Sequence, residues 1–301
     1  MPWQKLIIEV SSDNRALVEQ STIEMGALSI SLEDAGDEPL LEPAPGETPV
    51  WSRTRLSALF PETVDRSSVV SCLTALGVSP SAWERLDDRQ WERVWLDDFE
   101  PVLFGDRLWI CPHGQSPPDT TSSAPGAQCV VHLDPGLAFG TGRHATTALC
   151  LEWLSAAALD GQTVLDYGCG SGILGLAATA LGATRVYGID IDEQALIATR
   201  DNAIANGVSG LFVVARPEDY HSDPVDIAVA NILAGPLISL AGTLAGAVRT
   251  GGAVMLSGIL DEQADQVRLA YEPWFDMEQP TVRAGWARLN GIRNDRVHTV
   301  S

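Results

Sequence analysis

Three glycines at alternate positions, 168, 170 and 172, follow a short apolar run that ends in Asp166. A helix-forming run begins after Gly172, so the order predicts a strand, a tight turn and a helix start. Glycine adopts positive φ without strain and lets a ligand approach the backbone closely. The free N–H groups of a helix start favour anionic ligands. The turn is therefore a candidate binding site, with a purely structural turn as the alternative.

A second apolar run, at residues 185–189, ends in Asp190, which lies 22 residues after Gly168. In a parallel βαβ unit, an acid at the end of the second strand can accept hydrogen bonds from both ribose hydroxyls. An adenosine-containing cofactor is therefore expected. The spacing G-x-G-x-G differs from the dinucleotide fingerprint G-x-G-x-x-G. Together the two stretches resemble the first two motifs of S-adenosylmethionine-dependent methyltransferases, and a NAD site is the alternative.

The 301 residues carry a formal net charge of −21 and are long enough for about two domains. Residues 1–100 contain 19 acidic and 8 basic side chains, so the negative charge is densest there. Such a field repels a nucleic-acid backbone and attracts a basic partner. We expect no direct nucleic-acid binding and a basic protein as partner. The alternative explanation of the charge is solubility or a salty cytoplasm.

The five cysteines are scattered and form no C-x-x-C pair, so we expect neither a disulfide framework nor a metal site. The N-terminus lacks the pattern of a signal peptide, and no run of 18 apolar residues exists. We therefore expect a cytoplasmic protein without membrane contact, and a monomer.

The first 82 residues have the pattern β-α-β-β-α-β. Strands are expected at residues 3–10, 28–32, 51–60 and shortly after 76, and helices at 14–25 and 67–76. The first helix is expected to group Leu17, Val18, Ser21 and Met25 on one face. This order is the split pattern of a ferredoxin-like α+β module. We interpret residues 1–82 as a substrate-recognition domain, with a purely structural role as the alternative.

Residues 83–128 are expected to link this domain to the next one. Trp91, Trp95 and Phe99 are four residues apart, which predicts a helix with an aromatic stripe within 84–104. A strand is expected within residues 106–112, and residues 114–128 are rich in Ser, Pro, Thr and Gly, as in a flexible loop.

From residue 129 to 301, apolar strands alternate with helices, which predicts a doubly wound, mostly parallel α/β sheet. The expected strands are 163–167, 185–190, 210–215, 226–231 and 253–257, and the expected helices are 143–158, 172–181, 193–206, 236–249 and 261–271. Residues 286–292 are expected to close the sheet as an antiparallel edge strand. Ligands of such sheets bind at the carboxyl ends of the strands, where the glycine turn, Asp190 and Asn231 all fall.

Three further stretches narrow the family: Phe139-Gly-Thr-Gly, Asn231-Ile-Leu-Ala-Gly-Pro-Leu and Ser257-Gly-Ile-Leu. With these motifs the chain closely resembles the ribosomal protein L-11 methyltransferases, from Trp3 to Gly291. It departs from the usual Gly-Thr-Gly-Thr-His-Pro-Thr-Thr, because Arg143 and Ala145 replace the second Thr and the Pro. The resemblance implies a class I, Rossmann-like methyltransferase domain after a smaller ferredoxin-like domain.

The resemblance also implies S-adenosylmethionine as cofactor and methylation of lysine side-chain and N-terminal amines of ribosomal protein L-11. The implied cofactor-binding residues are Thr147, Gly168, Asp190 and Asn231, with Gly170 and Phe139 beside them. The Asn231 amide oxygen suits alignment of an incoming amine, so we take Asn231 as the catalytic residue, with a helix cap as its alternative role. His144 is interpreted as structural. A small-molecule N- or O-methyltransferase and a non-catalytic cofactor-binding adaptor are the alternative functions.

Overall fold

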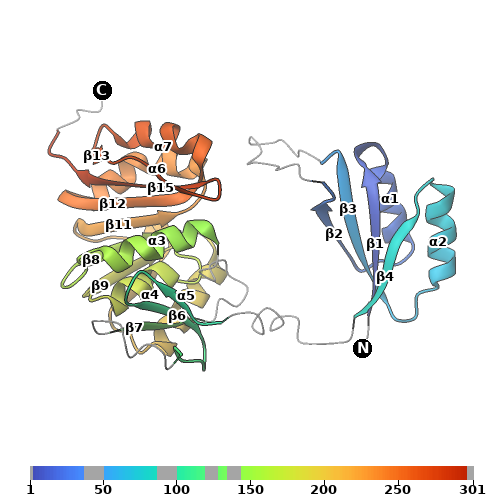
Figure 1. Ribbon diagram of the computed structural model, residues 1–301, viewed down its shortest axis with the longest axis horizontal. Helices are drawn as coiled ribbons and strands as arrows, with labels where there is room; N and C mark the ends of the chain where they lie inside the picture. Colours follow the sequence, from blue (N-terminus) through green and yellow to red (C-terminus); the bar gives the residue numbers. More distant parts are fainter. Residues whose placement is uncertain (1–2, 37–50, 87–99, 119–127, 134–143, 297–301) are drawn as a thin grey trace. The chain divides into compact units, whose positions relative to one another are not determined.

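The computed structural model describes residues 3–36, 51–86, 100–118, 128–133 and 144–296 (Figure 1). The chain divides into two compact units, Met1–Val94 and Trp95–Ser301. Within the described ranges, no helix combines the length and the apolar character that crossing a membrane requires.

The first unit is a four-stranded antiparallel sheet covered by two helices (Figure 1). Its elements are β1 (Trp3–Ser11), α1 (Ser12–Glu24), β2 (Ser29–Asp34), β3 (Arg53–Pro61), α2 (Arg66–Ala75) and β4 (Pro80–Leu86). The strand order is β2-β3-β1-β4, and each neighbouring pair is antiparallel. This is the predicted ferredoxin-like arrangement.

The core of the first unit forms because β1 alternates buried and less buried residues. Leu6 and Ile8 point to one face, where they pack with Val18 of α1. The predicted face of α1 was partly wrong: Leu17 is 55% exposed, and Thr22 is buried together with Val18. Residues four apart share a helix face, so Val18 and Thr22 face the sheet and Leu17 lies to the side.

The second unit is built on a mostly parallel sheet with the order β10-β9-β8-β11-β12-β15-β13, with β14 paired to β15. Its strands are β8 (Thr163–Tyr167), β9 (Arg185–Ile189), β10 (Phe212–Ala215), β11 (Val225–Asn231), β12 (Val248–Leu260), β13 (Phe275–Met277), β14 (Thr281–Arg283) and β15 (Trp286–Arg293). Strands β8 to β12 pair in parallel. The predicted doubly wound α/β fold is confirmed.

Helices cover both faces of this sheet (Figure 1). They are α3 (Ala145–Ala156), α4 (Ile173–Ala180), α5 (Glu193–Ala205), α6 (Ala234–Ala247) and α7 (Ala264–Tyr271). One core cluster joins α3, α4 and α5 to the sheet, and a second joins α6 and α7 to its other face. Burial on both faces explains why the central strands are continuous apolar runs.

The C-terminal strand differs from its predicted place. β15 is antiparallel to β12, as expected, but β13 pairs with its outer side, so β15 is not the edge of the sheet. Buried Phe275 anchors β13. The predicted helix 236–249 is shifted by two residues, because α6 begins at Ala234 and ends at Ala247, and β12 begins at once with Val248.

A small sheet of β5 (Val102–Phe104), β6 (Leu108–Pro112) and β7 (Cys129–Leu133) packs into the same core as α3 and α4. The helix predicted within 84–104 was expected to end at Pro101, and it is wrong at its start, because residues 84–86 belong to strand β4. Its aromatic residues Trp91, Trp95 and Phe99 lie outside the described residues. The domain boundaries at 82 and 128 stay a prediction.

Candidate active site

The glycine turn joins β8 to α4 with positive φ at each of its three glycines: +77° at Gly168, +55° at Gly170 and +80° at Gly172. Side chains with a Cβ rarely adopt such angles. A Cβ at Gly168 would also lie 2.3 Å from Cγ2 of Ile232. The turn is fastened to β9, because the N–H groups of Gly168 and Cys169 both donate to the carbonyl of Ile189, at 2.7 and 3.0 Å.

Asp190 stands directly after β9 and holds the turn with its side chain. Its Oδ2 accepts the N–H of Gly170 at 3.0 Å, and its Oδ1 accepts the N–H of Asp192 at 3.0 Å. A carboxylate has about four lone-pair sites, so each oxygen keeps capacity for one further donor. The carboxylate is therefore oriented by the backbone and still able to accept two hydroxyl groups.

Asp166, in β8, is only 1% exposed and caps the start of α4. Its Oδ2 accepts the N–H of Gly175 at 2.9 Å, while Oδ1 accepts no hydrogen bond from the described residues. Burial raises the pKa of Asp166 to about 7, the Gly175 hydrogen bond opposes the rise, and the charge of Asp190 adds to it. Asp166 was predicted as the end of a strand but not as a site residue.

Asn231 and Thr147 meet although they are 84 residues apart. Asn231 ends β11, and Thr147 lies buried in the first turn of α3. Nδ2 of Asn231 donates to Oγ1 of Thr147 at 3.2 Å. Oδ1 of Asn231 is buried and has no hydrogen-bond partner among the described residues. The N-cap of α6 is Leu233, so Asn231 does not have the capping role considered above.

His144 is the N-cap residue of α3, and its contacts are with neighbouring side chains. Its Nδ1 lies 2.8 Å from Oγ1 of Thr146, and its ring meets that of Trp286 edge to face, with centroids 4.8 Å apart. These contacts hold the ring beside the first turn of α3.

Five of the six expected cofactor-binding residues lie at the carboxyl ends of parallel strands or on the helix starts beside them: Thr147, Gly168, Gly170, Asp190 and Asn231. The sixth, Phe139, lies outside the described residues, as does Arg143. Direct contacts join Gly170 to Asp190 and Asn231 to Thr147. Ile232 follows Asn231 and links the two pairs, because its side chain covers Gly168. Ile232 was not predicted as a site residue, because its apolar side chain resembles that of any core residue.

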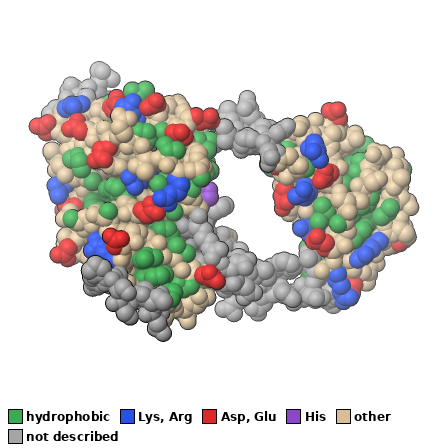
Figure 2. All heavy atoms as spheres, viewed as in Figure 1, with side chains coloured by type: hydrophobic (Ala, Val, Ile, Leu, Met, Phe, Trp, Pro, Cys, Tyr) green, Lys and Arg blue, Asp and Glu red, His purple; other side chains and the backbone are tan. Residues whose placement is uncertain are grey.

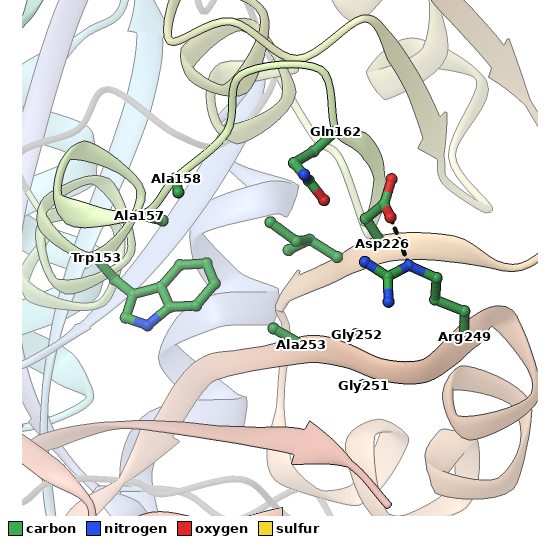
Figure 3. A pocket seen from close by; sticks show the side chains of 10 residues that line it. Trp153, Ala157, Ala158, Gln162, Asp226, Arg249, Gly251, Gly252 and Ala253 are labelled. Atoms are coloured by element: carbon green, nitrogen blue, oxygen red, sulfur yellow. Dashed lines mark hydrogen bonds and ion pairs between the residues drawn. The ribbon is translucent and has the colours of Figure 1, made fainter.

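A hollow of about 230 Å³ lies at the end of the strands that is opposite to the glycine turn, where β11 and β12 run past the end of α3 (Figure 3). Its charged residues already form an ion pair, with Nε of Arg249 2.6 Å from Oδ1 of Asp226. None of the described site residues lines it. The described residues also contain no group of three or more His, Cys, Asp or Glu side chains able to hold a metal ion.

A family model and curated relatives of known name indicate the same family for this chain. The family model described as ribosomal protein L11 methyltransferase (PrmA) matches residues 2–294. Ribosomal protein L11 methyltransferase of Methylococcus capsulatus is 50% identical over 97% of this chain and 99% of its own length. The protein of the same name from Azotobacter vinelandii is 48% identical over 97% of this chain and 100% of its own length.

A solved structure agrees with these relatives. The crystal structure of ribosomal protein L11 methylase from Lactobacillus delbrueckii subsp. bulgaricus is 31% identical, with a TM-score of 0.58. It matches 65% of this chain and 100% of its own chain. The resemblance that the motifs indicated thus extends over nearly the whole sequence, and this chain belongs to the ribosomal protein L11 methyltransferase family.

Proposed function

We propose that this protein transfers methyl groups from S-adenosylmethionine to ribosomal protein L11. The family and the names of its relatives support the reaction and the substrate. The observation that carries the proposal within the structure is the contact of Asn231 with Thr147, which leaves a buried amide oxygen beside the glycine turn.

The described residues fit the parts of S-adenosylmethionine. Asp190 keeps two acceptor sites for the ribose hydroxyls, and the glycine turn lets the cofactor approach the backbone. The first turn of α3, with Thr147, suits the methionine carboxylate, because helix N-termini favour anions. The proposed cofactor-binding residues are Thr147, Gly168, Gly170, Asp190, Asn231 and Phe139.

The proposed acceptors are lysine side-chain amines and the N-terminal amine of L11. S-adenosylmethionine, when bound, supplies a methyl group on a sulfonium sulfur. A lysine ammonium has a reference pKa of about 10.4, so it must lose a proton before its lone pair is available. Asn231 carries no titratable group, and we therefore assign it an orienting role: its Oδ1 accepts an N–H of the neutral amine and directs the lone pair. The ammonium proton is released to bulk water before the amine reacts.

In this mechanism the protein acts mainly by positioning and desolvation. Oγ1 of Thr147 accepts a hydrogen bond from Nδ2 of Asn231 and so fixes the amide, which leaves Oδ1 for the substrate. A small error in this orientation is expected to be costly, since misplacement by about 1 Å can reduce a rate by about 100-fold.

We further propose that residues 1–82 recognise the protein substrate, that residues 83–128 link them to the catalytic part, and that residues 129–301 carry the reaction. The first unit has its own hydrophobic core, formed by Leu6, Leu56, Phe60 and their neighbours. A module that folds around its own core can bind a partner without forming part of the cofactor site. We propose that the protein acts as a cytoplasmic monomer without nucleic-acid or membrane contact.

The test is transfer of labelled methyl groups from S-adenosylmethionine to a mixture of purified ribosomal proteins, followed by the intact mass of each. We expect L11 to gain mass in multiples of one methyl group and the other proteins to stay unchanged. If no ribosomal protein is labelled although the cofactor binds, the substrate assignment is wrong, and labelling of small amines or phenols would identify a small-molecule enzyme. Cofactor binding without transfer to any acceptor would identify an adaptor.

The role of Asn231 is tested in the same assay with Asn231→Leu, which keeps the size of the side chain and removes both polar ends. We expect kcat to fall by at least about 100-fold. Gln162→Ala, in the hollow at the opposite end of the strands, is the matched control and should keep wild-type activity. Wild-type kcat in Asn231→Leu would contradict the orienting role without affecting the substrate assignment.

A further inference from the structure

Helix α5 carries two buried polar side chains whose hydrogen bonds leave the helix. Thr199 is 0% and Asn202 3% exposed. Oγ1 of Thr199 donates to the carbonyl of Gly170 at 2.9 Å, and Nδ2 of Asn202 donates to the carbonyl of Ser171 at 2.9 Å. The two residues are three positions apart and therefore share a face of the helix. That face binds consecutive carbonyls of the glycine turn.

Gly170 is consequently held from both sides. Its N–H donates to Asp190, directly after β9, and its carbonyl accepts from Thr199, on the helix that follows. Since a peptide unit is planar, fixing the Gly170 carbonyl also fixes the direction of the Ser171 N–H. In the same way, the hydrogen bond from Asn202 fixes the Ser171 carbonyl and with it the direction of the Gly172 N–H. The side chains of α5 thus set the directions of backbone groups in a turn whose glycines would otherwise allow many conformations.

The contact between α5 and the turn is close. A Cβ at Gly172 would lie 3.0 Å from both Cγ2 and Oγ1 of Thr199. A Cβ at Gly188 would lie 3.4 Å from Cγ2 of Thr199. The methyl group of Thr199 therefore packs against the turn and β9 while the hydroxyl binds the turn, and the two functions can be separated by substitution.

The same face of α5 continues to Asn206, the residue that ends the helix. Its Oδ1 accepts the N–H of His132 in β7 at 2.8 Å, and its Nδ2 donates to the His132 carbonyl at 2.6 Å. Nδ2 also donates to the carbonyl of Asn202 at 2.8 Å. One row of side chains on α5 thus fastens both the glycine turn and β7.

We propose that Thr199 and Asn202 are positioning residues that set the affinity for S-adenosylmethionine by fixing the peptide planes of Gly170 and Ser171. Neither side chain is assigned a contact with the cofactor or with the reacting atoms. The inference rests on the proposed function, in which the glycine turn binds the cofactor.

The test compares Thr199→Val with Thr199→Ser in the full-length protein, by calorimetric titration with S-adenosylhomocysteine. Valine keeps the methyl packing and loses the hydroxyl, whereas serine keeps the hydroxyl and loses a methyl. Leaving a partly buried acceptor, the Gly170 carbonyl, unpaired is costly, so we expect Thr199→Val to raise Kd by about 10-fold and Thr199→Ser to stay within about 2-fold of wild type. Thr179→Val is the control, because its hydroxyl donates to Leu176 of its own helix.

Asn202→Asp provides a second variant of unchanged size, in which an acceptor faces the Ser171 carbonyl. It should raise Kd at least as much as Thr199→Val. With saturating cofactor, kcat of both variants on L11 should stay within about 2-fold of wild type, while KM for the cofactor rises with Kd.

If Thr199→Val or Asn202→Asp binds S-adenosylhomocysteine with the wild-type Kd, the inference is wrong. It is also wrong if Thr199→Ser loses more affinity than Thr199→Val, because that result indicates that Thr199 acts through the packing of its methyl group. If the wild-type protein itself does not bind S-adenosylhomocysteine, the proposed function fails instead.

Discussion

Asp166 is the residue whose environment departs most from that of an ordinary carboxyl group in this site. Its side chain is buried, and it receives one hydrogen bond, from Gly175, among the described residues. The same carboxyl group caps α4, where Gly172 at the N-cap position has no side chain to do so. A protonated Asp166 can still accept the Gly175 N–H, so capping does not require the charge.

Protonation of Asp166 predicts a specific dependence of stability on pH. Burial raises its pKa from 3.8 to about 7, so between pH 4 and 7 the folded state keeps a proton that the unfolded state releases. The free energy of unfolding therefore falls as pH rises through this window, by as much as about 4 kcal/mol. Asp166→Asn has no such proton, and its stability relative to wild type should increase by a few kcal/mol from about pH 5 to about pH 8.

The measurement is urea unfolding of both proteins at the two pH values, following the transition of the second unit. A stability difference that does not change with pH would show that Asp166 is ionised in the folded protein throughout.

At the scale of elements, the glycine turn after β8 and the end of the neighbouring strand β11 depend on each other. Ile232, at the end of β11, occupies the space that a Cβ of Gly168 would need. Ile232 is itself held by its N–H, which donates to the carbonyl of Ser257 in β12 at 3.1 Å. The shape of the turn therefore depends on three neighbouring strands: β8, which precedes it, β11 and β12.

Gly168→Ala should disrupt this arrangement in two ways, by positive φ and by the clash with Ile232. The backbone term alone costs about 1–2 kcal/mol. Gly161 is a matched control, because its φ is +76° and no described atom lies within 4 Å of its Cβ position. We expect Gly168→Ala to destabilise the second unit more than Gly161→Ala does, and to weaken binding of S-adenosylhomocysteine at least about 10-fold.

Adding Ile232→Ala to Gly168→Ala should relieve the clash but not the backbone strain. The loss in the free energy of unfolding of the double variant is expected to be smaller than the sum of the losses in the two single variants, by about 1 kcal/mol or more. Additive effects in thermal and urea unfolding would mean that the turn yields to the new methyl group without involving Ile232.

The sequence predicted most elements of the second unit, because hydrophobic runs and glycine breaks mark them directly. β8 lies at the predicted residues 163–167, and the paired motifs of the turn and Asp190 indicated that β8 and β9 form a parallel βαβ unit, which the structure contains. β13 was missed because three residues are too few for a periodic pattern. The aromatic spacing in 84–104 suggested a helix, but strand pairing with β1 and β6 determines the ends of that stretch.

At the candidate site, local signals predicted the glycines, Asp190 and Asn231, since each ends a strand or forms a turn. They could not find Thr199, Asn202 or Ile232. These residues act on the turn from separate elements, through contacts that only the tertiary structure creates. A polar residue within a helix pattern is ordinarily assigned to the solvent side, and its burial depends on which element packs over it.

At the scale of the whole molecule, the charge is distributed unevenly. Of the 19 acidic residues in 1–100, 4 lie in 37–50 and 5 in 87–99, against 2 basic residues in these two stretches. The remaining residues of 3–86 contain 9 acidic and 6 basic side chains. Acidic and basic side chains are interspersed on the face of the molecule in view in Figure 2. Within residues 1–100, attraction of a basic partner is therefore expected to come mainly from residues 37–50 and 87–99.

This distribution gives a prediction for the recognition of L11. A variant that replaces the five acids of residues 87–99 by their amides should raise KM for L11 several-fold at low salt and reduce its dependence on salt. Kd for S-adenosylhomocysteine should not change. The control replaces five exposed acids of the second unit: Asp106, Asp201, Asp223, Asp261 and Glu262. An equal effect of both variants on KM would assign the attraction to net charge alone.

The separate cores of the two units have a consequence for what stability means in this protein. The described core residues of the first unit end at Trp83, and those of the second begin at Val102, with none in common. We therefore expect each unit to unfold with its own free energy, so that a single melting temperature does not describe the chain. Ligand linkage then acts on one unit at a time: a small molecule held at the glycine turn protects the second unit from heat and proteases and leaves the first as vulnerable as before.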